Sequence, residues 1–358
     1  MIYPLSQVKS DVITLYKQIW VLFLICLFHM PSLALEQQFN LSTYFDSNPR
    51  ENIENKEPTF GLKAKGLLRF DKEGQSGRIY GSILGQGFLE PALFLDSKVV
   101  VNGELGGHYR ITPGYRFYVG FTTFQKLYFD DLQRTGRSTL SGSLKRLKSQ
   151  KMHQELGLRR TDFRIDFGTL FQYTEQKVFL NLTRQMGADF QAELSAQIGR
   201  IDYEDYPARI LSGDSLILSG SENQQDNTLM LGLHVKHLGK MIWGVAVNFE
   251  DINSNSAIEE AQIWSGKLYV SGRLSDQVFF HIVLNGMKKF YAQTDIFEAT
   301  LYRDPEENIQ NQLHIQLERV IHPSRVLYIQ YSYIKNETVF NHWFYDKNLI
   351  ETGLKLTF

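Results

Sequence analysis

Most of the sequence after Gln37 consists of segments in which apolar and polar residues alternate. The segments run for about ten to fifteen residues each, and helical periodicity is hard to find between them. Successive side chains of a β-strand point to opposite faces, so each segment predicts a strand with one apolar and one polar face. The cleanest segment covers 98–111, where one face carries Val99, Val101, Gly103, Leu105, Gly107, Tyr109 and Ile111.

The last segment, Leu349 to Phe358, follows the same rule and ends on an aromatic residue. One side carries Thr352, Leu354, Leu356 and Phe358, and the other carries Glu351, Gly353, Lys355 and Thr357. We therefore expect the chain to finish in an amphipathic strand.

Counting such segments predicts about sixteen strands, with fourteen as the alternative, because predicted boundaries err by a few residues. Between 154 and 203 the pattern predicts four of them, at 154–160, 163–173, 178–184 and 190–203. Short connections are expected at 71–76, 112–114, 238–240, 275–276 and 322–324. Longer ones are expected at 46–58, 130–150, 204–227, 291–308 and 336–348. Short and long connections alternate, as in an antiparallel barrel that has both ends of the chain on one side.

A closed antiparallel transmembrane β-barrel explains this pattern best. Lipid offers no partner for backbone N–H and C=O groups, so strands can cross it only when every edge is paired. Aromatic residues make up 13% of the chain, which suits strands and membrane interfaces. The alternative is a secreted all-β sandwich or propeller, although no repeat of about forty residues typical of a propeller is visible.

Residues 1–34 resemble a secretory signal peptide. Lys9 and Lys17 precede the apolar run 19–28, and Ser32-Leu33-Ala34 fits a cleavage site. The run is shorter than the roughly twenty residues of a spanning helix. An uncleaved membrane anchor is the alternative. We therefore expect export through the Sec pathway and a single barrel domain over 35–358.

The single cysteine, Cys26, lies inside this run. A cleaved chain would contain no cysteine, so a disulfide, a zinc–thiolate site and a cysteine nucleophile are not expected.

Three stretches carry a resemblance to bacterial outer-membrane β-barrels. The last strand, with Leu354, Leu356 and the terminal Phe358, is similar to the closing strand of that family, in which it is the assembly signal. Stretches 41–50, with its Tyr-Phe-Asp-Ser-Asn, and 331–358 resemble a porin-like group of largely uncharacterised function. The resemblance implies the outer membrane of a Gram-negative bacterium, contact with its lipid and lipopolysaccharide, and insertion by the barrel-assembly machinery. Some relatives that export polysaccharide or lipoproteins follow periplasmic helical repeats, which this chain does not show.

The face opposite the apolar one carries charges of both signs. A barrel of about sixteen strands has room for a water-filled channel, and rings of charge set the selectivity of such channels. The alternative is an interior packed with salt bridges and without an open path. The candidate lumen-lining residues are Lys63, Lys65, Arg69, Glu104, His108, Arg110, Arg164, Asp166, Glu318 and Lys355.

The predicted loop 130–150 is rich in basic residues. It could attract anionic solutes, bind lipopolysaccharide phosphates, or fold inward and narrow the pore; a solvated loop without a partner is the alternative. Its candidate extracellular residues are Arg134, Arg137, Lys145, Arg146 and Lys148.

No catalytic, cofactor or metal site is predicted. The sequence contains no Gly-x-Ser-x-Gly and no His-Glu-x-x-His motif. His234 and His237 are three residues apart, so a strand would point them to opposite faces. The formal net charge of −1 does not favour nucleic acid as a partner.

These observations predict a passive or weakly selective pore for small solutes, narrowed by the 130–150 and 204–227 loops. The alternative function is a structural or surface-interaction barrel with a closed lumen and partner-binding loops.

Overall fold

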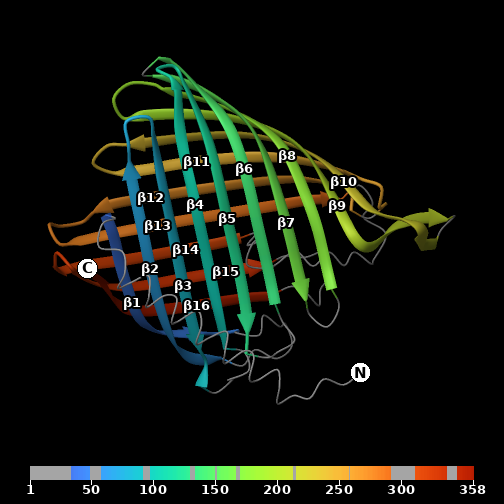
Figure 1. Cartoon of the computed structure of the whole chain (residues 1–358). Helices are drawn as coiled ribbons and strands as arrows, with labels where there is room; N and C mark the ends of the chain where they lie inside the picture. Colours follow the sequence, from blue (N-terminus) through green and yellow to red (C-terminus); the bar gives the residue numbers. More distant parts are fainter. Residues whose placement is uncertain are drawn as a thin grey trace.

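The chain folds into one closed barrel of sixteen antiparallel strands, each paired with its neighbour in sequence (Figure 1). The computed structural model describes residues 34–48, 58–91, 97–129, 134–149, 151–166, 170–212, 215–257, 259–291, 311–336 and 345–358. Within these residues no helix is long and apolar enough to cross a membrane. The strands are β1 (Ala34–Asp46), β2 (Thr59–Glu73), β3 (Gly77–Leu89), β4 (Lys98–Thr112), β5 (Tyr115–Tyr128), β6 (Arg134–Ser149), β7 (Met152–Asp166), β8 (Leu170–Gln185), β9 (Phe190–Ser212), β10 (Ser215–Leu238), β11 (Ile242–Ser254), β12 (Ala261–Arg273), β13 (Val278–Tyr291), β14 (Asn311–His322), β15 (Arg325–Asn336) and β16 (Tyr345–Thr357).

Strand β16 closes the barrel against β1. Their ladder runs from Gln38 opposite Thr357 to Asp46 opposite Leu349, and the amide of Phe358 donates to the carbonyl of Gln37 over 2.9 Å. The prediction that the last segment is an amphipathic strand is confirmed. Closure leaves no open sheet edge along this seam, which is what a lipid environment requires.

The two ends of the barrel differ in their connections. The start of β1 and the end of β16 lie on the side where short links such as 113–114 and 323–324 join the strands. We call this side the turn end and the opposite side the loop end.

The exterior of the barrel is apolar. Along β5 the outward Phe117, Val119 and Phe121 are exposed, and comparable apolar side chains are exposed on nearly every other strand. Outward aromatic rings pair at both ends of the barrel, with Phe190 and Trp243 5.9 Å apart at the turn end and Phe249 and Trp264 5.0 Å apart at the loop end. An apolar band between aromatic girdles is the surface of a barrel that sits in a bilayer.

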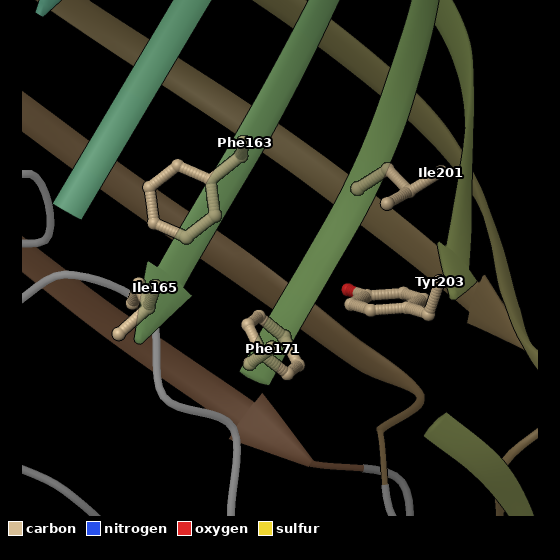
Figure 2. Packing of buried hydrophobic residues seen from close by; sticks show 5 residues of the cluster. All are labelled: Phe163, Ile165, Phe171, Ile201 and Tyr203. Carbon is tan, nitrogen blue, oxygen red and sulfur yellow. The ribbon is translucent and has the colours of Figure 1, made fainter. Parts of the chain in front are cut away.

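The inward face is polar along most of its length but apolar at the loop end of β7, β8 and β9. Figure 2 shows Phe163, Ile165, Phe171, Ile201 and Tyr203 gathered on these three strands. Ile165 is 1% exposed, and the rings of Phe171 and Tyr203 lie 5.7 Å apart. The hydroxyl of Tyr203 donates to Asp226 over 2.8 Å, so the cluster also joins β10.

Three predicted boundaries are wrong. Residues 134–149 form β6, where a loop over 130–150 was predicted. The predicted loop 204–227 lies within β9 and β10, which continue as a long hairpin beyond the rest of the barrel (Figure 1). The three strands predicted between 154 and 184 are only two, β7 and β8.

The long hairpin is irregular where it leaves the barrel. Its ladder shifts register between Leu218 and Asn223, and Asp205 adopts a left-handed φ of 53°. A non-glycine residue in that conformation costs free energy and marks a bend.

Candidate functional site: the interior wall of the barrel

The charged inward side chains of β2 to β7 are predominantly basic. Residues that face each other on paired strands point to the same side of the sheet, so the register shows which side chains point inward. On these strands the inward side chains include many cations but few acids. We call this surface the basic wall. Its cations are Lys63, Lys65, Arg69, Arg78, Lys98, Arg110, Arg116, Lys126, Arg137, Lys145 and Arg159, and its acids are Asp71, Glu73, Glu104 and Glu155.

The opposite wall, formed by β8 to β16, has a more even balance of charge. Lys177 pairs with Glu175 at 2.7 Å, and Lys355 forms an ion pair and a hydrogen bond with Glu318. His281 lies 4.0 Å from the same Glu318 carboxylate. Lys177 and Lys355 are therefore neutralised locally.

A buried network ties the closing seam together. Glu351 of β16 is 3% exposed and accepts hydrogen bonds from Ser42 of β1 at 2.9 Å and from Tyr328 of β15 at 2.5 Å. Its other carboxylate oxygen lies 2.9 Å from the ammonium of Lys63 on β2. One carboxylate thus joins four neighbouring strands, and its charge is compensated by a hydrogen-bonded cation.

A recess of about 370 Å³ opens in the basic wall between β1 and β6. We call this cavity the basic recess. Its floor is a row of residues that face one another across successive strands. The row runs from β1 to β6 as Gln38, Leu67, Leu84, Asn102, Phe124 and Arg137.

Charged residues flank the floor on both sides. Lys65 lies on the loop-end side of Leu67 in β2, and Arg69 lies on the turn-end side, about 13 Å from Lys65 along the strand. Glu104 is the one carboxylate in the lining, beside Ser82 and Thr122. Lys65, Arg69 and Arg137 are the cations of the lining, and Arg69 also lies 3.8 Å from Glu36.

A second group of cations lies nearer the turn end of the same wall. Arg110 of β4 faces Arg116 of β5, which faces Lys145 of β6. Like charges directly opposite one another destabilise a sheet. The Nε atom of Arg116 is buried and makes no hydrogen bond to any residue in the described part of the chain.

Most of the predicted lumen-lining residues face inward: Lys63, Lys65, Arg69, Glu104, His108, Arg110, Glu318 and Lys355. Lys63 is largely buried in its pair with Glu351, and the ring of His108 packs on Tyr118 at 5.1 Å. The placement predicted for Arg164 and Asp166 is wrong. Both point outward at the loop end of β7, because Phe163 and Ile165 occupy the inward positions there.

The five basic residues of the predicted loop 130–150 do not form one patch. All lie in β6, so their assignment to an extracellular loop is wrong. Arg137 and Lys145 point inward, whereas Arg134, Arg146 and Lys148 point outward. Arg134 and Arg137 lie toward the loop end, and the other three lie toward the turn end.

The histidines that the structure describes do not assemble into a metal site. His234 faces inward near the hydroxyl of Tyr269, while His237 faces outward between Phe190 and Trp243, as their spacing predicted. Across the residues that the structure describes, no group of three or more His, Cys, Asp or Glu side chains could hold a metal ion.

Fold and interior together define a class of protein, the closed antiparallel transmembrane β-barrel with a charged interior. No family model and no curated protein matches the sequence. Solved structures resemble the chain at low identity. The trimer form of OmpT, an outer membrane protein of Vibrio cholerae, is 10% identical with a TM-score of 0.48, covering 91% of this chain and 99% of that one. CdiB from Acinetobacter baumannii is 8% identical with a TM-score of 0.47, covering 90% and 60%. OccK1 from Pseudomonas aeruginosa is 8% identical with a TM-score of 0.44, covering 91% and 99%.

Proposed function

We propose that this protein is a pore of the Gram-negative outer membrane, through which small solutes diffuse passively or with weak selectivity. The observation that carries the proposal is the combination of a closed sixteen-strand barrel, an apolar exterior and a charged interior wall. A barrel of this strand number is wide enough for an aqueous channel. Charges on the channel wall would then set which solutes pass. The proposed role is not enzymatic.

The test is conductance of the purified, refolded full-length protein in a planar bilayer. Discrete unit steps are expected, with a reversal potential that departs from zero in a salt gradient because the basic wall favours anions. Protein that is folded by its heat-modifiable gel migration, yet never conducts, contradicts the pore.

The lipid contacts belong to the same proposal. Arg134 and Arg164 point outward at the loop end, where lipopolysaccharide phosphates would lie if this end is extracellular. Arg146 and Lys148 point outward at the turn end, where phospholipid headgroups would lie if that end is periplasmic. Export would use the Sec pathway, and insertion would use the barrel-assembly machinery through β16.

A structural or surface-interaction barrel is the second candidate, and one feature favours it. The hairpin β9–β10 extends beyond the rim and exposes Ile210, Ile217 and Leu218. If this role is correct, shortening the hairpin abolishes adhesion of cells to a surface partner, and the intact protein shows no conductance.

A further inference from the structure

The lipid-facing surface of β11 to β15 contains a cavity of about 540 Å³, which we call the apolar trough. Its floor lies where Gly266 of β12 faces Gly286 of β13, at two outward positions that carry no side chain. Lys267, Asn285 and Gln312 also line it, but their side chains belong to the inward face. Its walls are outward apolar side chains: Val245, Val247, Leu268, Leu284, Leu313 and Tyr333.

The packing of the barrel does not require glycine at these two positions. A Cβ on Gly266 would lie 3.8 Å from the carbonyl oxygen of Ala246, and one on Gly286 would lie 3.6 Å from Oδ1 of Asn311. Both are ordinary van der Waals distances, so neither position excludes a side chain. Glycine inside a strand weakens it and often marks a place where another molecule approaches closely. The open volume is therefore available to something outside the protein.

The position of the trough along the barrel axis indicates which part of a lipid it meets. Trp264 and Phe249 form an outward ring pair, 5.0 Å apart, in the row immediately nearer the loop end. Outward aromatic rings of this kind lie at the level of the lipid headgroups. The trough is one row further toward the middle of the barrel, so it lies where the acyl chains begin.

A cation lies at the loop-end side of the trough. Lys288 faces Trp264 and lies two residues from Gly286, about 7 Å along β13. Its side chain is exposed, its ammonium lies 4.8 Å from the ring centre of Phe290, and it forms no ion pair with any residue that the structure describes. Asp251, an outward acid, is two strands away on β11. A lysine at headgroup level attracts the phosphate of an anionic lipid.

The trough and the lysine match the two parts of one lipid molecule. From Lys288 to Leu284, β13 covers about 14 Å, so a lipid whose phosphate meets the lysine can extend a chain along the trough. Lipid tails are as apolar as leucine, so the chain is held by van der Waals contact rather than by the hydrophobic effect. Preference for one headgroup over another then comes from the charge of Lys288.

We infer that the apolar trough binds one acyl chain of an anionic membrane lipid and that Lys288 holds the phosphate of the same lipid. The inference rests on the bilayer position of the barrel in the proposed function, but it does not require an open pore. The site differs from the outward arginines of β6 and β7 because it combines a cation with a shaped apolar surface.

The experiment uses Trp264 as its reporter, because this ring lies beside Lys288. Full-length protein is reconstituted in phosphatidylcholine vesicles with a fixed minor fraction of phosphatidate. Bromine is carried either by the phosphatidate or by an equal amount of phosphatidylcholine, and brominated chains quench tryptophan on contact. Subtracting the signal of Trp264→Phe removes the contribution of the other tryptophans. Phosphatidate is expected to be favoured about fivefold, the effect of one basic residue near an anionic lipid. Raising the ionic strength is expected to reduce this preference.

Two variants test the two parts of the site separately. Lys288→Gln removes the charge and is expected to abolish the preference, so that both brominated lipids quench equally. Gly266→Leu fills the trough and is expected to lower the preference although Lys288 is intact.

The matched control is Gly85→Leu, which is expected to keep the fivefold preference. Gly85 of β3 is also outward, faces Gly66 of β2, and has open space around it. No lysine or arginine is outward between this pair and the loop end of the two strands, where the outward residues are Phe60, Leu62, Ala64, Gly87 and Leu89. Each variant is checked for heat-modifiable migration, which shows that it is folded.

Equal quenching by the two brominated lipids in the wild type would overturn the inference, and so would a preference that survives in Lys288→Gln. A preference that is unchanged in Gly266→Leu, or lost equally in Gly85→Leu, would show that the trough does not hold the chain. Conductance in planar bilayers separates this inference from the proposed function. A lipid preference without conductance would refute the pore and leave the lipid site, whereas conductance without a preference would do the reverse.

Discussion

Replacing Glu351 with alanine is expected to lower the unfolding free energy of the barrel by about 3–5 kcal/mol, the usual cost of removing one partner of a buried ion pair. The variant leaves the ammonium of Lys63 charged and mostly buried, since its side chain is 15% exposed. It also removes the acceptor of the hydroxyls of Ser42 and Tyr328. Access of water to Lys63 places the loss toward the lower end of the range.

The two halves of this cost can be separated. Glu351→Gln keeps an acceptor for both hydroxyls but removes the charge, so it is expected to cost less than alanine. The double variant Lys63→Met, Glu351→Leu removes both charges and fills the space with apolar atoms. Because replacing a whole buried pair is often neutral or stabilising, the double variant is expected to recover the part of the loss that comes from the unpaired Lys63. The hydroxyls of Ser42 and Tyr328 still lack their acceptor in it, so the double variant is expected to remain less stable than the wild type.

Urea unfolding in lipid vesicles provides the measurement. Trp243 and Trp264 lie on the outward face, so their fluorescence reports loss of the lipid-facing surface. The midpoint is expected to fall without a change of the m-value, which identifies a loss of stability. The control is Arg160→Ala, which breaks an outward ion pair whose arginine side chain is 58% exposed and should cost no more than about 1 kcal/mol. If Glu351→Ala costs no more than this control, or if the double variant is as unstable as the single one, the argument is refuted.

Three further predictions address closure, assembly and the long hairpin. Gly353→Val is expected to lower the unfolding free energy by about 1–3 kcal/mol, because a Cβ there would lie 2.6 Å from the carbonyl oxygen of Leu41. The control Gly85→Val has open space around it and is expected to show the normal shift on a heat-modifiability gel. Phe358→Ala is expected to reduce the amount of barrel in the outer-membrane fraction of cells while leaving urea stability in vesicles unchanged, since the ring is 75% exposed and makes little packing contact; a matching loss of stability in vesicles would argue against a pure assembly role. Replacing residues 211–216 with a short turn is expected to leave the urea midpoint within error of the wild type, because the residues described in this stretch pair only between β9 and β10. A large drop would mean that the hairpin supports the barrel.

The strand number was predicted correctly, but partly because two errors cancelled. The missed strand β6 was offset by dividing β7 and β8 into three. Strand β6 has few apolar outward residues, chiefly Leu140 and Leu144 among Gly, Ser and Arg, so its alternation is weak. Strand length would have exposed the error, because 154–160 is shorter than the nine to eleven residues or so that a membrane-crossing strand needs. In the β9–β10 hairpin the pattern fades for a physical reason, since strands beyond the rim have no lipid to face.

The misplacement of Arg164 and Asp166 follows from a rule that fails at one end of the barrel. Alternation predicts that apolar side chains point to lipid and charged ones to the interior. At the loop end of β7 the interior is itself apolar, with Phe163 and Ile165 packed against Phe171. Which side chains of such a strand point inward must therefore be derived from the register with the neighbouring strands. The outward Leu156 and Leu158 on the same strand agree with that register.

The basic recess could not be predicted for a related reason. Its lining comes from six strands, and no two neighbouring members of its floor are close in sequence: Leu67 meets Leu84, and Phe124 meets Arg137, only because the hairpins are in one particular register. Lys63 and Glu351 are 288 residues apart. If the register of any strand from β1 to β6 shifted by one residue, the side chains that it places in the recess would point to the lipid instead. The seam network and the apolar exterior oppose such a slip, since it would bury unpaired charge in hydrocarbon. The contacts that close the barrel thus also hold the recess in place, although no residue of the seam network lines it.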